Sequence, residues 1–147
     1  MTSLSCKGNR VAESEPREAT IEIGYPGSAI SVNHYMGRRK DGGTYVKPAA
    51  RAWMDELGWC VKQLHLEDWS LPLHIRCSGR FKDGRSTPDL SNLSKCTCDA
   101  IEDMTGINDQ NYRWHDGDIS YCENGDTPLL WITISESKIA SAENRPG

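Results

Sequence analysis

The stretch from Thr87 to Asp109 constrains the fold of this 147-residue chain more than any other. Its apolar side chains recur at three- and four-residue spacing from Leu90 to Met104, which is the spacing of one helix face. A Pro-Asp pair stands at its start and favours an extended residue followed by a helix N-terminus. Gly106 follows the last apolar position, where a left-handed C-cap is expected. We therefore expect an amphipathic helix here, packed on the rest of a domain.

A second helix and several strands are predicted around this one. Pro48 opens an apolar stripe at helical spacing that runs to Leu64. Asp116-Gly117 is predicted to be a turn, and Asn124-Gly125 indicates a hairpin. Alternating or β-branched patterns predict extended segments at 20–25, 30–36, 44–46, 71–81, 112–114, 119–122 and 129–135.

This order of elements predicts an α+β fold: two main helices packed on a mixed, largely antiparallel sheet. No internal repeat or linker divides the chain, so a single domain is expected over residues 20–137. Residues 1–19 and 138–147 lack periodicity and are predicted to be flexible tails.

The composition excludes a membrane-spanning chain and favours a reducing compartment. No run of eighteen apolar residues exists, and the N-terminus has no apolar signal-peptide core. The chain has six cysteines, which without an export signal are better explained as reduced thiols than as disulfides. We therefore expect a cytoplasmic protein that does not associate with membranes.

The charge is unevenly distributed along the chain. The net charge is −4, yet the segment from Arg38 to Arg85 contains ten Lys or Arg residues against six Asp or Glu. A basic middle with acidic flanks is compatible with binding a polyanion through one face. Arg38, Arg39 and Lys40 lie in a turn-rich loop, where they are either a phosphate-gripping finger or a solvated loop tip.

Acidic and basic side chains gather around the start of the central helix. Lys95 and Asp99 are four residues apart and therefore neighbours on one helix face, and Asp109 follows in a loop that could fold back. Carboxylates with one lysine suit metal-dependent phosphodiester cleavage, because oxygen ligands hold Mg²⁺ and a lysine stabilises developing charge. The alternative is structural, with Asp89 as a helix cap and Lys95–Asp99 as a surface pair.

The same residues resemble the RusA family of Holliday junction resolvases. Pro88–Lys95 (PDLSNLSK) is similar to the family motif of aspartates, asparagine and lysine. Asp99-Ala100-Ile101, Gly106 and Asn108-Asp109 follow in the family's order. The likeness extends co-linearly over residues 20–136 and includes Ser31–Tyr35 before the basic loop.

The resemblance implies a homodimeric α+β nuclease that binds four-way DNA junctions and cuts them with Mg²⁺, or alternatively Mn²⁺, in DNA recombination and repair. By position, Asp89 and Asp109 are the implied metal ligands and Lys95 the catalytic lysine. Ser91 occupies the position of the family's second catalytic aspartate. Asn92 matches the motif's asparagine and is implied, with the basic loop, to contact DNA.

Ser91 opens two further interpretations, because a hydroxyl is a weaker metal ligand than a carboxylate but a favoured helix cap. Asp99, Asp103 or Asp118 could supply the missing carboxylate. Alternatively, the chain is a catalytically weakened or inactive protein that binds branched DNA without cutting it. A metal-free structural dimer is a third hypothesis.

Overall fold

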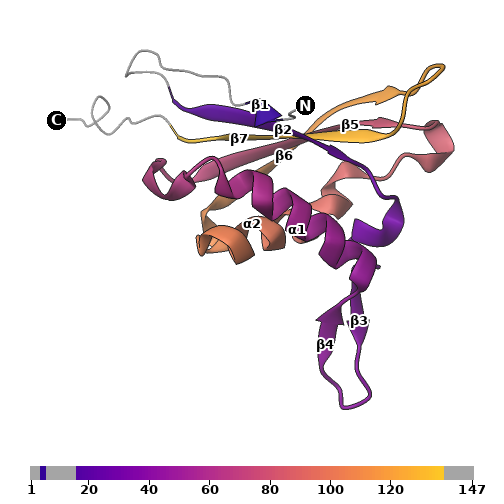
Figure 1. The fold of residues 1–147 in the computed structure, drawn as a ribbon, viewed down its shortest axis with the longest axis horizontal. Helices are drawn as coiled ribbons and strands as arrows, with labels where there is room; N and C mark the ends of the chain where they lie inside the picture. The colour runs from indigo at the N-terminus through magenta and orange to yellow at the C-terminus, as the bar shows by residue number, and fades with distance from the viewer. Residues whose placement is uncertain (1–3, 6–15, 138–147) are drawn as a thin grey trace.

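A five-stranded mixed sheet forms one layer of the computed structural model, and both long helices pack on one of its faces (Figure 1). The structure describes residues 4–5 and 16–137. The strand order is β1-β2-β7-β5-β6. The strands span Leu4–Ser5 (β1), Glu18–Gly24 (β2), Leu73–Phe81 (β5), Tyr112–Tyr121 (β6) and Leu129–Ser135 (β7).

Among the described strands of this sheet, only β5 and β6 are parallel neighbours, while β1, β2, β7 and β5 pair antiparallel in turn. The helix α2 (Ser94–Thr105) connects β5 to β6, as a parallel pair requires a crossover connection. The predicted α+β fold with a mixed, largely antiparallel sheet and two main helices is therefore confirmed.

The core lies between the sheet and the helix α1 (Pro48–Lys62), which begins with proline at its first turn as predicted. Trp53, Leu57 and Val61 of α1 are buried. They share the core with alternate strand residues such as Ile21 and Ile132, whose neighbours in sequence face the opposite side of the sheet. This arrangement leaves one face of α2 free to carry polar groups.

A separate two-stranded hairpin, β3 (Met36–Arg38) and β4 (Thr44–Val46), projects away from the body of the domain next to α1 (Figure 1). The expected turn-rich loop is present between these two strands and contains Arg39 and Lys40. Gly42 has a φ of 97°, a conformation that suits glycine in a tight loop.

The extended segment predicted at 30–36 is wrong. Ser28–Ile30 forms a 3-10 helix (η1), and turns follow in which the amides of His34 and Tyr35 donate to the Ser31 carbonyl. Ile30 and Tyr35 are the buried residues of this segment, so its apolar positions do not alternate as a strand would require.

One turn prediction and one hairpin prediction near the C-terminus are also wrong. Asp116-Gly117 lies inside one continuous strand, β6, at a register shift against β5 between Cys77 and Gly79. A side chain at Gly117 would collide with Ser78, so this glycine permits a close strand approach rather than a turn.

Asn124-Gly125 connects β6 to β7, with Gly125 at a φ of 87°. These strands are not neighbours, because β5 lies between them. The turn is therefore real, but the hairpin is not.

The predicted tails fall largely outside the described residues, which exclude 1–3, 6–15 and 138–147. Within the predicted N-terminal tail, Leu4–Ser5 pairs with β2, and β2 begins at Glu18 rather than Thr20. The five cysteines in the described part of the chain, at positions 60, 77, 96, 98 and 122, are free thiols. None of the described helices is long and apolar enough to cross a membrane.

Candidate metal centre

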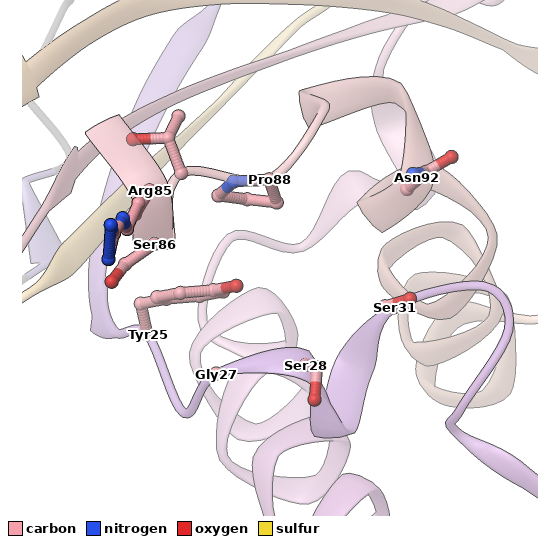
Figure 2. A pocket seen from close by; sticks show the side chains of 9 residues that line it. Tyr25, Gly27, Ser28, Ser31, Arg85, Ser86, Pro88 and Asn92 are labelled. Atoms are coloured by element: carbon pink, nitrogen blue, oxygen red, sulfur yellow. The ribbon is translucent and has the colours of Figure 1, made fainter. Parts of the chain in front are cut away.

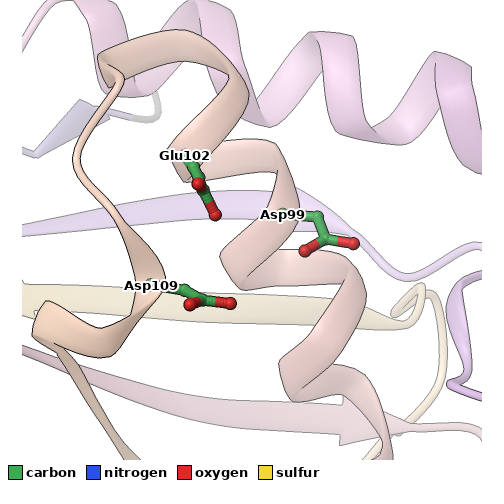
Figure 3. Close-up of side chains that lie close together, drawn as sticks. All are labelled: Asp99, Glu102 and Asp109. Carbon is green, nitrogen blue, oxygen red and sulfur yellow. The ribbon is translucent and has the colours of Figure 1, made fainter.

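Three carboxylates converge where α2 faces the loop that follows it (Figure 3). Asp99 and Glu102 lie one turn apart on α2, and Asp109 approaches them from the loop. One carboxylate oxygen of each lies within 4.8 Å of the others. We call these three residues the acidic cluster. The expectation that Asp109 folds back onto the helix is confirmed.

Asp109 is positioned by a defined reversal of the chain after α2. Gly106 ends the helix at a φ of 78°, the left-handed C-cap that the sequence predicted. The Tyr112 hydroxyl donates to the Ile107 carbonyl at 2.8 Å, which attaches the loop to β6. Asn108 caps the short 3-10 helix η5 (Asp109–Asn111), so Asp109 sits at the first position of an ordered turn.

Asp99 has two donors of its own. The ammonium of Lys95 lies 3.1 Å from Asp99 Oδ1, and the Tyr35 hydroxyl donates to Oδ2 at 2.6 Å. The hydrogen bond to Asp99, together with the charges of Asp109 and Glu102, raises the pKa of Lys95, so it stays charged. Burial and the bond to Asp99 raise the pKa of Tyr35, which therefore stays a neutral donor.

The predicted residues at the start of the segment serve as a local cap. Asp89 is the N-cap of the 3-10 helix η4 (Leu90–Leu93) and accepts from the Ser91 amide at 3.3 Å. The Ser91 hydroxyl donates to the same oxygen of Asp89 at 3.0 Å. Asp89 is not a member of the acidic cluster. The capping role considered for it is confirmed, and its pairing with Asp109 on a metal stays a prediction.

The structure distinguishes among the three acids considered as substitutes for the carboxylate missing at Ser91. Asp99 belongs to the acidic cluster, whereas Asp103 lies 3.6 Å from Arg51 and Asp118 lies 3.2 Å from Arg76. Sequence reasoning missed Glu102, although its position three residues after Asp99 places it on the same helix face.

The predicted DNA-contacting residues lie apart from the cluster. Arg38, Arg39 and Lys40 are exposed on the β3–β4 hairpin and form no ion pair with any described residue. Asn92 is half-buried in η4, and its carbonyl accepts from the Val32 amide at 2.8 Å. The hairpin charges are therefore free for a polyanion, and Asn92 connects the central segment to the loop after β2.

The cysteines beside the cluster do not offer an alternative chemistry. Burial, and then the charge of Asp99, raise the pKa of both Cys96 and Cys98 to about 12. Thiols with so high a pKa are protonated at neutral pH, and the thiolate is the nucleophilic form.

Comparisons with known proteins do not assign a family. No family model matches the chain, and no curated protein matches it. Among solved structures, a chain of the HypE-HypF complex matches with a TM-score of 0.42 at 14% sequence identity. The match covers 82% of this chain and 32% of that one.

The chemistry of the acidic cluster follows from its donors. Three carboxylates supply hard oxygen ligands, which fit a hard divalent cation and leave further positions to water or substrate. Exposed acidic groups also occur without a metal, and here Lys95 offsets one negative charge. The arrangement is thus one that could bind a divalent cation next to a fixed lysine.

Proposed function

We propose that this protein is a Mg²⁺-dependent endodeoxyribonuclease that resolves Holliday junctions or other branched DNA in the cytoplasm. The observation that carries the proposal is the acidic cluster, with the Lys95 ammonium fixed 3.1 Å from Asp99. The resemblance of Pro88–Lys95 and Asp109 to the RusA motif is the reason for proposing branched DNA as the substrate of this site. Three carboxylates and a lysine are a donor set suited to phosphodiester hydrolysis.

The roles of the chain's own residues follow from their contacts. Asp99, Glu102 and Asp109 would hold Mg²⁺, which when bound orients water and offsets phosphate charge. The Tyr35 hydroxyl orients Asp99, and the Lys95 ammonium lies where it can stabilise charge on a transferring phosphoryl group. Ser91 replaces the family's aspartate, so Asp99 and Glu102 supply the charge it lacks.

Substrate binding would use the hairpin and a second copy of the chain. Arg38, Arg39 and Lys40 project from the domain and suit phosphate contacts. One active centre per chain cannot cut two opposed strands at once, so paired incision implies a symmetric homodimer.

A second candidate function is binding of branched DNA without cleavage. It is favoured by Ser91, which stands where the family motif has a second carboxylate. The Ser91 hydroxyl donates to an oxygen of Asp89 at 3.0 Å. In that case the fold and the hairpin serve recognition, and the acidic cluster serves helix packing alone.

The deciding experiment uses a labelled four-way junction, a matched linear duplex, and Mg²⁺, Mn²⁺ or EDTA. Wild-type protein is expected to cut the junction with either metal and not in EDTA, and Asp109→Asn to lose cleavage. Asp55→Asn is the control, because Asp55 is an exposed acid of α1 whose partner, Arg51, is outside the cluster.

Three results separate the hypotheses. Metal-dependent cleavage that Asp109→Asn removes supports the nuclease. Specific junction binding without cleavage supports the second candidate. Neither binding nor cleavage overturns both.

A further inference from the structure

A cavity of about 370 Å³ opens between two loops that are far apart in sequence (Figure 2). One wall is the loop after β2, from Tyr25 to Ser31, and the other runs from Arg85 to Asn92 after β5. The hydrogen bond from the Val32 amide to the Asn92 carbonyl joins the two walls, so the cavity is preformed. Its volume lies within the range of small-ligand pockets.

The aromatic wall is rigid. The Tyr25 ring packs edge-on against Phe81, with centroids 5.0 Å apart at 89°. The backbone amide of Tyr25 donates to the Pro128 carbonyl. Burial raises the pKa of the Tyr25 hydroxyl, which is therefore a neutral donor. In Figure 2 the Pro88 ring lies across the cavity from Tyr25, so the two rings can border a flat group.

Three polar side chains of this cavity lack partners among the described residues. The Tyr25 hydroxyl, the Arg85 guanidinium and the Ser28 hydroxyl form no side-chain hydrogen bond with any described residue. No carboxylate of the described residues lines the cavity. A cation and hydroxyl donors that face open space without an acid are suited to an anion, and arginine suits phosphate in particular.

The cavity is connected to the acidic cluster by one helical segment. Asn92 lines the cavity, Lys95 follows three residues later, and Asp99 follows after four more, so all three lie near one helix face. With the rises of 3-10 and α-helices, Asn92 and Asp99 are roughly 11 Å apart along the axis. A nucleic-acid strand held at the cavity would therefore continue toward the cluster.

We propose that this cavity binds one nucleotide of a single DNA strand beside the cleavage site. The phosphate would bind Arg85 and the Ser28 hydroxyl, and the sugar and base would lie between Tyr25 and Pro88. Base stacking on an aromatic ring is tolerant of sequence, so the cavity would favour unpaired nucleotides over particular bases. The inference rests on the proposed function for its substrate, and it adds the unpaired nucleotide at the branch as the feature recognised.

The test is an NMR titration of the full-length protein with a 5′-phosphorylated thymidine dinucleotide, with inorganic phosphate and thymidine in parallel. The dinucleotide is expected to shift the Tyr25 ring and Arg85 Nε signals, and to bind more tightly than either part alone. Arg85→Ala should weaken binding about tenfold or more, as the loss of a charge-assisted hydrogen bond implies. Lys82→Ala, an exposed charge outside the cavity, should change it less than about twofold.

The other outcomes count against the proposal. Absent shifts at Tyr25 and Arg85, or equal affinity in wild type and Arg85→Ala, would overturn it. Equal affinity for phosphate and dinucleotide would reduce the cavity to a phosphate site and overturn the nucleotide claim.

The outcomes also distinguish a failure of the proposed function from a failure of the cavity proposal. If the dinucleotide binds in the cavity but wild type neither binds nor cuts junctions, the nuclease hypothesis fails and the cavity stands. If wild type cuts junctions but the dinucleotide shifts neither the Tyr25 nor the Arg85 signals, the cavity proposal fails and the nuclease hypothesis stands.

Discussion

Two carboxylate sites of this molecule lie in opposite surroundings. Glu136 is buried and accepts from the Arg17 amide at 2.6 Å, the Ser70 amide at 2.9 Å and the Arg17 guanidinium at 3.1 Å. In the acidic cluster, three carboxylates share one lysine, and among the described residues only Asp99 has close side-chain donors. A carboxylate saturated with donors has no capacity left for a ligand, whereas an under-neutralised group favours a bound cation.

The same difference separates structural acids from candidate functional ones. Burial acts to raise the pKa of Glu136, but its hydrogen bonds to Arg17 and Ser70 outweigh burial, so the pKa lies below its usual value. The net effect is a gain in folding stability from the ionised form. Among the described residues, no comparable set of donors surrounds Glu102 or Asp109, and Lys95, which pairs with Asp99, offsets only one of the three negative charges of the cluster.

The largest expected effect tests the cluster directly. Replacing Asp99 by asparagine removes a charged ligand and should reduce Mn²⁺ affinity and junction cleavage by about 100-fold. Glu136→Gln, tested below its unfolding temperature, should leave both within about twofold because it lies in a site saturated by its own protein. Metal binding is measured by electron paramagnetic resonance of free Mn²⁺. Equal metal affinity in both variants would contradict the distinction between a metal-binding cluster and the saturated carboxylate of Glu136.

Folding stability should depend more on Glu136 than on the acidic cluster, which is the opposite of the order expected for metal binding. Glu136→Gln removes a charge that accepts several hydrogen bonds and should lower the free energy of unfolding by about 1–3 kcal/mol. Asp109→Asn, at an exposed position, should change it by less than about 0.5 kcal/mol. Urea denaturation followed by tryptophan fluorescence gives both values. A larger loss in Asp109→Asn would mean that the cluster is a folding element.

The pH dependence provides a finer test of Glu136. A carboxyl whose pKa is lowered on folding contributes stability above its unfolded pKa, and that contribution is lost as pH falls through the folded value. The stability difference between wild type and Glu136→Gln should therefore be constant at neutral pH. It should shrink below about pH 4.5, the ordinary value for this carboxyl. Denaturation curves between pH 3 and pH 7 would measure it, and a pH-independent difference would contradict this account.

The hairpin supplies cations that neither acid site uses. Replacing Arg38, Arg39 and Lys40 together by alanine should lower the salt dependence of junction binding by roughly one log–log unit per lost phosphate contact. Fold stability should hardly change, since exposed charges contribute little. Anisotropy titrations over a range of NaCl concentrations measure the slope. An unchanged slope would show that the hairpin tip is only a solvated loop.

The smallest effect is expected at Ser91. Ser91→Asp replaces the donor to Asp89 with a second carboxylate, so the variant should be less stable by up to about 1 kcal/mol without metal. Mg²⁺ should restore this loss if Asp89 and position 91 can share a cation with the cluster. Thermal unfolding with and without 10 mM Mg²⁺, compared with Ser91→Asn, measures the restoration. Restoration in the asparagine variant too would show that charge at position 91 is irrelevant.

Local sequence signals are enough to predict most of the elements and part of the site. Helical spacing, Pro48 and Gly106 located both helices, and alternation located β7 at Leu129–Ser135. These signals are local, because periodicity and capping depend on residues within a few positions of each other. For the same reason, the Lys95–Asp99 pair, which is observed at 3.1 Å, could be read from four-residue spacing.

Tertiary structure alone decided which residues far apart in sequence meet. The Asn124-Gly125 turn carries a hairpin signal, but β5 takes the place beside β7, because strand partners are chosen by burial of the whole sheet face. Likewise, no spacing rule connects Tyr35 with Asp99, or Tyr25 with Arg85. The cavity arises from the packing of two loops whose contacts are long-range and leave no periodic trace in the sequence.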